Sequence, residues 1–444
     1  MVFSGRFLIL ALVCLLPVLV RPGTDTILWC LLALALVAAA DLLLAASPRT
    51  LGLERELPAS SRLDEHVDNA LLVTNRGRRR LRGSVRDAWQ PSAGQTVPPS
   101  SPPPSSPPRA DAAVALDVPA GERRRTLTHL VPRRRGTLRT PSATVRSWGP
   151  LRVAGRQLTI PAPGQISILP PFRSRRHLPS RLARLREMDG RSAVQHRGAG
   201  TEFDSLRDYV RGDDVRSIDW RATARRQDVV VRTWRPERDR RVVIVLDTSR
   251  TAAARVDDEP KLDTGIEAAL LLAALASAGG DRVELIAFDR RVRARASSTQ
   301  KGNLLHRMVT ALAPVQPTLL SADWSSIPVE VAAVSRQRSL VVLLTDLDAS
   351  SLQEGLLPVL PALTARHQVV VASVADPQLA QMARVRDDAE TTFRAAAAER
   401  AGLERRAAAR ELEMLGVEVV DEAPHVLPPA LADTYLRLKA AGRL

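Results

Sequence analysis

The stretch VVIVLDTSRT, residues 242–251, decides the fold class of the largest part of this chain. Its first five residues, Val242–Leu246, are all apolar, and the first polar residue after them is Asp247. An apolar run of this length is typical of a strand that is buried on both faces, as in a parallel sheet covered by helices. The stretch therefore predicts a central strand that ends at a carboxylate.

The residues downstream of this strand alternate between strand-like and helix-like patterns. Further strands are expected at Arg282–Phe288, Leu340–Leu344, Val369–Val374 and Val417–Val420. Helices are expected between them, at Leu262–Ala278, Leu304–Leu312, Pro328–Ser335, Ser351–Arg366, Ala389–Leu415 and Pro429–Ala441. This alternation predicts a doubly wound α/β domain over residues 241–444.

Residues 49–165, upstream of this domain, show no long helical period. We expect a small β-sandwich there, with strands at Val67–Asn75, Leu81–Ala88, Thr126–Val131 and Ala143–Trp148. Residues 90–110 are rich in proline and serine, so we expect a flexible loop between two strands, with a proline-rich ligand as the alternative. Residues 166–240 form a separate segment that is dense in charge.

Residues 1–48 contain two apolar runs, Phe7–Val20 and Ile27–Ala46, with Arg21-Pro22-Gly23 between them. A membrane-spanning helix needs about 20 residues, so the first run spans a membrane only if it starts near Val2. The two runs predict a transmembrane helical hairpin. A cleaved signal peptide is the alternative, but no small-residue cleavage site follows the first run.

Arginine is more abundant after the second apolar run than in the turn between the runs. Arg49, Arg55 and Arg62 follow the run, whereas the turn carries only Arg21. Positive residues are retained on the cytoplasmic side, so we expect an inner-membrane protein whose large body is cytoplasmic. Asp41, near the end of the second run, is expected to be a carboxylate at the membrane interface.

The chain is strongly basic, with a formal net charge of +16 over 444 residues. Lysine occurs at only three positions, so 61 of the 64 basic residues are arginine, an imbalance that GC-rich coding produces without any ligand. The arginine clusters at residues 78–80, 123–125 and 133–135 fit contact with membrane lipid or solvated faces. No nucleic-acid partner is expected, because no nucleic-acid module accompanies the charge.

The residues after the first strand suggest a metal site. Asp247, Ser249 and Thr251 offer a carboxylate and two hydroxyls at alternate positions, and Asp346 follows a later strand. Ligands bind beyond the carboxyl ends of strands in such sheets, and hard oxygen donors suit Mg²⁺ or Mn²⁺. The alternative is that Asp247 only caps the next turn and pairs with Arg250.

This spacing resembles the metal-ion-dependent adhesion site of von Willebrand factor type A domains, Asp-x-Ser-x-Ser, with Thr251 in the last position. The resemblance implies that Asp346 and a distal threonine complete the site. That threonine is expected near Ser321-Ala322-Asp323, where this chain has no threonine.

The charged segment carries a second set of candidate residues between Gly198 and Arg225, where acids and arginines interleave. Paired acids could perform acid–base chemistry, which leaves a metal-dependent enzyme as the alternative function, but we favour structural ion pairs, because the acids interleave with arginines. The residues singled out are Gly200, Glu202, Phe203, Arg207, Tyr209, Gly212, Asp213, Asp214, Arg216, Asp219, Trp220 and Arg225.

These motifs resemble the signature of the DUF58 family, a domain of unknown function. The family pattern is matched at residues 198–203, 206–209, 212–220 and 222–225, and the resemblance extends over nearly the whole chain. It implies a type A-like domain and a link to MoxR-type AAA+ ATPases and transglutaminase-like membrane proteins. No Walker A, HExxH or Gly-x-Ser-x-Gly motif is present. We therefore expect a non-catalytic, membrane-anchored adaptor rather than an enzyme.

Overall fold

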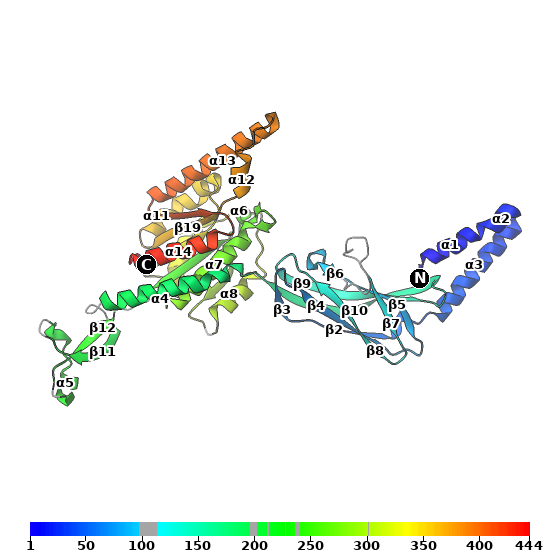
Figure 1. Cartoon of the computed structure of the whole chain (residues 1–444), viewed down its shortest axis with the longest axis horizontal. Coiled ribbons are helices and arrows are strands. Elements are labelled where there is room, and N and C mark those ends of the chain that lie inside the picture. The colour runs from blue at the N-terminus through cyan, green and yellow to red at the C-terminus, as the bar shows by residue number, and fades with distance from the viewer. Residues whose placement is uncertain (97–112, 196–201, 211–212, 227, 236–239, 301) are drawn as a thin grey trace. The chain divides into compact units, whose positions relative to one another are not determined.

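The computed structural model describes residues 1–96, 113–195, 202–210, 213–226, 228–235, 240–300 and 302–444. The chain divides into two compact units, Met1–Pro171 and Phe172–Leu444 (Figure 1). The predicted segments 1–48 and 49–165 both lie in the first unit. The second unit has a mixed α/β architecture and holds most of the charged segment together with residues 241–444.

The first unit begins with the short strand β1 (Val2–Phe3) and three apolar helices, α1 (Gly5–Val13), α2 (Leu15–Val20) and α3 (Thr24–Leu44). The expected start of the first helix near Val2 is wrong: the Ser4 hydroxyl accepts from the Arg6 N–H and caps α1 instead. The helix is interrupted at Cys14 because Pro17 has no N–H to donate to Val13.

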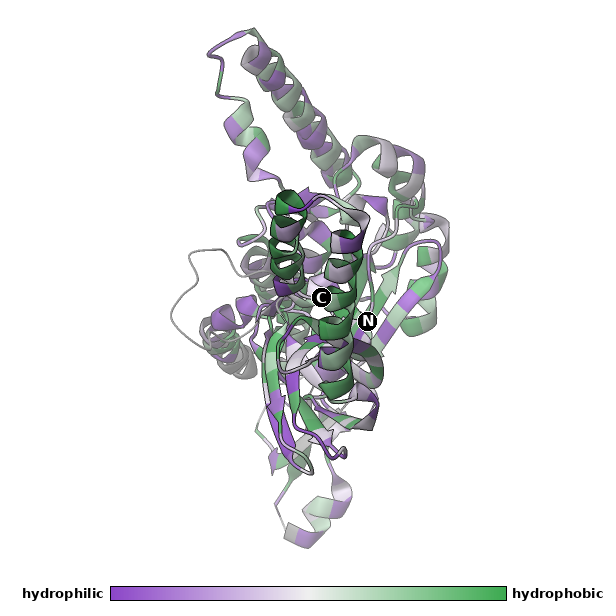
Figure 2. Ribbon diagram, turned by 90° about the vertical axis from the view of Figure 1, so that its right-hand side faces the viewer, coloured by the Kyte–Doolittle hydropathy of each residue, from purple (hydrophilic) through white to green (hydrophobic). Residues whose placement is uncertain are grey.

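Helix α3 is long and apolar enough to anchor the protein in a membrane. Within Thr24–Thr50 the most apolar stretch of 18 residues has a mean hydropathy of 2.6, whereas Gly5–Val20 is a shorter apolar helix. Their ribbons are largely green, the colour of hydrophobic residues, in Figure 2.

The rest of the first unit consists of two mainly antiparallel sheets that pack through apolar side chains. One sheet has the order β1-β10-β9-β5-β7, with β3 parallel to β10, and the other has the order β2-β4-β8-β6. The strands are β2 (Leu51–Glu56), β3 (Ser60–Arg62), β4 (Val67–Asn75), β5 (Leu81–Asp87), β6 (Gln95–Thr96), β7 (Val114–Val118), β8 (Arg123–Leu130), β9 (Gly136–Trp148) and β10 (Ala154–Leu169).

Strand β10, which the sequence did not predict, is the longest in the first unit. Its pairing with β9 shifts between Pro161 and Gly164, so a local irregularity accommodates Pro161 and Pro163 within the strand. Residues 91–96 of the expected loop form a short 3₁₀ turn and β6, while 97–112 lie outside the described residues.

The second unit is built on a six-stranded sheet of order β17-β16-β13-β18-β19-β20. All neighbouring strands are parallel except β17, which runs antiparallel to β16 at one edge. Its strands are β13 (Arg241–Asp247), β16 (Arg282–Phe288), β17 (Val292–Ser297), β18 (Leu340–Leu344), β19 (Gln368–Val374) and β20 (Glu418–Glu422). Two short strands, β14 (Arg255–Val256) and β15 (Glu259–Pro260), pair with each other directly before α7 (Lys261–Ala278).

Helices cover both faces of this sheet, which is why its central strands are buried throughout. Alternate residues of β13 point to opposite faces: Val243 and Val245 pack with Leu412, whereas Leu246 lies against Gly265 of α7. The helices are α4 (Leu178–Gln195), α6 (Arg250–Ala253), α7 (Lys261–Ala278), α8 (Leu304–Leu312), α9 (Ile327–Val334), α10 (Ala349–Ser351), α11 (Leu360–Thr364), α12 (Pro377–Met382), α13 (Ala389–Met414) and α14 (Leu427–Ala440).

Two helical expectations need correction. The single helix predicted at Ser351–Arg366 is broken into α10, a π-helical turn at Leu352–Leu356, a 3₁₀ turn at Leu357–Val359 and α11, because Pro358 and Pro361 cannot donate to the preceding turn. Helix α4 was not predicted, since its arginines masked the apolar face that buries Leu185.

Candidate functional site at the carboxyl edge of the sheet

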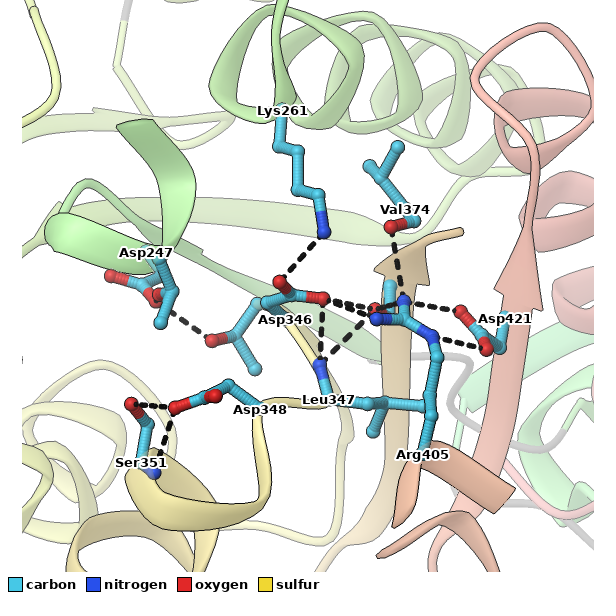
Figure 3. Close-up of polar contacts among 12 residues, drawn as sticks. Asp247, Lys261, Asp346, Leu347, Asp348, Ser351, Val374, Arg405 and Asp421 are labelled. Carbon is cyan, nitrogen blue, oxygen red and sulfur yellow. Dashed lines mark hydrogen bonds and ion pairs between the residues drawn. The ribbon is translucent and has the colours of Figure 1, made fainter. Parts of the chain in front are cut away.

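The parallel strands β13 and β18 are neighbours, so their carboxyl ends lie at the same edge of the sheet. Asp247 is the last residue of β13, and Thr345 and Asp346 follow β18 directly. The sequence prediction that Asp247 and Asp346 approach each other is therefore matched by the position of the two strands (Figure 3).

Asp247 is buried and is held by hydroxyl groups. Its Oδ1 accepts from the backbone N–H of Ser249 at 2.8 Å. Its Oδ2 accepts from the hydroxyls of Thr251 at 2.9 Å and Thr345 at 2.7 Å. The Ser249 and Thr251 hydroxyls lie 3.1 Å apart. Three hydroxyl oxygens and one carboxylate thus form a single oxygen-rich cluster.

This cluster leaves the charge of Asp247 uncompensated. Burial raises the pKa of the Asp247 carboxyl above its ordinary value, and the hydrogen bonds from Ser249, Thr345 and Thr251 offset this only in part. Within the described residues no cationic side chain pairs with Asp247. Of the alternative interpretation, the cap is present, as the hydrogen bond from the Ser249 N–H, but the ion pair with Arg250 is not. Burial therefore favours the neutral Asp247 carboxyl, whereas a cation placed beside it would favour the ionised form.

Asp346 lies at the same edge in the opposite electrostatic environment. Lys261 Nζ lies 2.7 Å from its Oδ2 and Arg405 Nη1 lies 2.8 Å from its Oδ1. Burial alone would raise the pKa of Asp346, but these two cations outweigh it and the pKa is lowered. Arg405 also reaches Asp421 at 2.6 Å, so Asp346 belongs to a ladder of alternating charges (Figure 3).

A cavity of about 230 Å³ lies beside Asp247. Its polar lining is dominated by hydroxyl groups and includes one arginine and, besides Asp247, the two acids Asp346 and Glu354. The lining residues that carry the argument are Asp247, Ser249, Arg250, Thr251, Ser321 and Thr345. Ala322 also lines this cavity, so the position where a distal threonine was expected does face the site, although it offers no oxygen.

The donor set suits a hard divalent cation that keeps several waters. The described residues contain no group of three or more His, Cys, Asp or Glu side chains placed to hold a metal. Asp247 and the hydroxyls of Ser249, Thr251 and Thr345 nevertheless present oxygen ligands to one place. Thr345 was missed from the sequence, where a hydroxyl residue directly before the strand-end Asp346 was its only signal.

The signature residues form a separate hairpin of β11 (Glu202–Asp208) and β12 (Val230–Arg235), with α5 (Trp220–Arg226) between the strands. Arg207 pairs with Asp213 at 2.6 Å, and Tyr209 donates its N–H to the Val229 carbonyl. The Asp214 carboxylate accepts from the Arg216 N–H at 2.9 Å. Gly200 and Gly212 lie outside the described residues.

Asp219 is the centre of this hairpin. Its Oδ1 accepts from the N–H groups of Arg221 and Ala222 at 3.0 Å, which caps α5, and its Oδ2 accepts from Arg232 at 2.9 Å. The neighbouring Trp220 is 69% exposed, and Arg225 is also exposed. Glu202 and Phe203 lie on β11 opposite Arg235 and Trp234. The signature acids Asp213, Asp214 and Asp219 are therefore engaged in local structure.

Replacing Asp219 by alanine should loosen this hairpin. The substitution removes the α5 cap and the ion pair to Arg232, so amide hydrogen exchange should accelerate across α5 and β12. The backbone N–H of Ala222 and the Arg232 side chain hold the pKa of Asp219 below its usual range. Its contribution is therefore present above the unfolded pKa and is lost as the pH falls through the lower folded pKa.

Asp208→Ala is the matched control for this experiment, because Asp208 is an exposed acid of the same hairpin. Its variant should exchange like the parent protein. Equal exchange rates in Asp219→Ala and Asp208→Ala would rule out the structural role.

Comparisons with known proteins identify the second unit by sequence. Residues 205–400 match the family model described as "Protein of unknown function DUF58". Uncharacterized proteins of Mycobacterium bovis and Mycobacterium tuberculosis are each 29% identical over 194 residues, which is 43% of this chain and 60% of theirs. The chain thus spans less than two thirds of the length of these curated relatives.

Solved structures show only weak likeness. The CARDB domain of a Pyrococcus furiosus protein aligns with a TM-score of 0.17 at 13% identity, over 27% of this chain and 93% of that one. An exo-β-N-acetylglucosaminidase from Vibrio harveyi aligns with a TM-score of 0.22 at 10% identity, over 84% of this chain and 75% of that one. Neither likeness carries an argument about function. The match over residues 205–400, which includes the hairpin from Ser205 onward and the Asp247 site, identifies this part of the chain as a domain of the DUF58 family.

Proposed function

We propose that this protein is a membrane-anchored, non-catalytic interaction module whose carboxyl-edge cavity binds a partner through a divalent cation. The observation that carries the proposal is Asp247, a buried carboxylate that accepts three hydrogen bonds and has no cationic partner in the described part of the chain. A partner carboxylate could complete the coordination of a cation held there.

The topology of the second unit supports a doubly wound, von Willebrand factor type A-like domain. Five parallel strands with one antiparallel edge strand, covered by helices on both faces, place Asp247 at the edge where such sheets bind ligands. The residues that would hold Mg²⁺ or Mn²⁺ are Asp247, Ser249, Thr251 and Thr345. Asp346 becomes a direct ligand only if it leaves Lys261.

The enzyme alternative gains no support from the signature acids. Asp213 and Asp219 each have a lowered pKa because an arginine and backbone N–H groups bind the ionised carboxylate. A general acid needs the opposite shift. The family resemblance names the partner class we propose, a MoxR-type AAA+ ATPase, together with a transglutaminase-like membrane protein. Helix α3 would hold the complex at the inner membrane, with the body in the cytoplasm.

Calorimetric titration of the full-length protein in detergent with Mg²⁺ or Mn²⁺ tests the metal site. Asp247→Asn should weaken binding by more than about ten-fold, because even groups that only orient a metal ligand contribute about 10–100-fold. Asp348→Asn is the control, since it removes a carboxylate charge at the same edge and asparagine still caps α10. Equal affinities for the two variants would overturn the metal site.

Affinity purification of the tagged full-length protein from its native membranes, with Mg²⁺ or with EDTA, tests the partner. Enrichment of an AAA+ ATPase that is lost with EDTA and in Asp247→Asn supports a cation-bridged adaptor. Enrichment that persists with EDTA and in Asp247→Asn would support the adaptor role and contradict the cation bridge. The absence of any AAA+ ATPase would contradict the adaptor role.

A further inference from the structure

Helices α1 and α3 are both fixed to one loop, residues 149–154, which joins β9 to β10. The Ser4 N–H donates to the Val153 carbonyl at 3.0 Å, and β1 pairs with the first residues of β10. Asp41 of α3 accepts from the N–H groups of Leu151, Val153 and Ala154 at 2.7–2.9 Å. The apolar helices therefore meet the sandwich at this loop.

A cavity of about 290 Å³ opens at this point. It is lined by Ser4, Arg6, Gly83, Ala115, Trp148 and Arg152, so two arginines and one tryptophan face a common space. Trp148 lies on the outer side of the sheet and is half-buried. Tryptophan is enriched at the level of lipid headgroups, where its ring is apolar and its N–H remains available.

The two arginines of this cavity carry charge that no acid neutralises. Arg6 donates from Nη1 to the Leu151 carbonyl at 3.3 Å, and among the described residues neither Arg6 nor Arg152 has a carboxylate within ion-pair distance. Both side chains are exposed. By contrast, the exposed Arg80 pairs with Asp117 and the exposed Arg123 pairs with Glu54.

The main chain of Arg152 is held in place on both sides. Its neighbours Leu151 and Val153 both donate to Asp41, its own carbonyl accepts from the Ser4 hydroxyl, and its φ of +56° lies in the left-handed region. A non-glycine residue adopts this conformation only where its surroundings impose it. The base of the Arg152 side chain is therefore positioned beside Arg6 at the end of the apolar helices.

We propose that this cavity binds the phosphate of an anionic phospholipid headgroup, with Arg6 and Arg152 as the phosphate ligands and Trp148 against the glycerol region. Guanidinium groups bind phosphate through paired, charge-assisted hydrogen bonds. The inference rests on the membrane anchoring proposed above. It would make the first unit selective for anionic membranes and fix the sandwich close to the bilayer surface.

The test is a titration of phosphatidylglycerol and phosphatidylcholine onto the full-length protein in detergent, with bound lipid counted by native mass spectrometry. The parent protein should bind phosphatidylglycerol about 30-fold more tightly, as expected for about 1 kcal/mol from each of the two arginines near an anionic surface. Arg6→Gln/Arg152→Gln should lose this preference, and Arg6→Lys/Arg152→Lys should restore part of it.

Arg133→Gln/Arg139→Gln is the matched control, because it removes two exposed arginines at the opposite end of β9. This variant should keep the preference. Equal loss in both double variants, or no preference in the parent protein, would overturn the site. Displacement of the lipid by inorganic phosphate alone, with the same arginine dependence, would make it a free-phosphate site and overturn the lipid assignment.

Reconstitution into lipid nanodiscs separates this inference from the anchoring on which it rests. A protein that fails to enter nanodiscs of any composition contradicts the anchoring. A protein that enters nanodiscs but shows no arginine-dependent preference for phosphatidylglycerol contradicts the headgroup site alone.

Discussion

Asp41→Ala is expected to destabilise the first unit by about 3 kcal/mol or more. The carboxylate is fully buried and accepts three backbone N–H groups, so its removal leaves three donors without a partner. Each unsatisfied buried donor costs about 1–3 kcal/mol. Gly149 packs directly against this carboxylate, since a Cβ there would lie 2.1 Å from Asp41 Oδ1.

Denaturant unfolding of the full-length protein in detergent measures this effect, with proteolysis of the 149–154 loop as a local readout. Asp25→Ala is the control, because Asp25 lies in the first turn of the same helix and is exposed. It should change the free energy of unfolding by about 0.5 kcal/mol. Similar unfolding of the two variants would show that Asp41 does not clamp α3 to the sandwich.

Lys439→Met is expected to destabilise the second unit by about 3–5 kcal/mol, the usual range for breaking a buried ion pair. Lys439 Nζ lies 2.8 Å from Asp281 Oδ1, and the two side chains are 4% and 2% exposed. The same amine contacts the Tyr435 hydroxyl at 2.9 Å and the Gly279 carbonyl at 3.0 Å. Without it, Asp281 is a buried charge whose remaining partner is a neutral hydroxyl.

A double variant distinguishes loss of the pair from loss of packing. Lys439→Met/Asp281→Asn should be more stable than Lys439→Met alone, because no buried charge is left behind. Arg437→Met is the control on the same helix: its ion pair with Glu418 is exposed on the arginine side, so the change should be about 0–1 kcal/mol. A single variant no less stable than this control would contradict the prediction.

The sequence contained one overlooked signal for these buried pairs. Among 64 basic residues only three are lysine, and two of them, Lys261 and Lys439, pair with buried carboxylates. The third, Lys301, lies outside the described residues. In a chain that otherwise uses arginine, lysine marks positions where a compact ammonium group fits a narrow buried space.

The sequence by itself determined the alternating strands and helices of the second unit. The predicted bounds Arg282–Phe288, Leu304–Leu312 and Leu340–Leu344 coincide with β16, α8 and β18. Apolar runs and caps are local properties of the chain, so they can be read without the partner elements. The same local reading failed at β10, where a bulge hides the strand, and at Ser351–Arg366, where prolines divide the helix.

Only the tertiary structure decided which groups surround each charge. Thr345, the residue after β18, reaches Asp247 from 98 positions away, and Arg405 reaches Asp346 from α13, 59 positions away. Asp41 meets its donors across 110–113 positions, which replaced the expected interfacial carboxylate by a buried clamp. The contacts of Asp247 depend on the parallel register of β13 with β18, and those of Asp41 depend on the turn after β9. Neither feature can be read from the residues that flank Asp247 or Asp41 in the sequence.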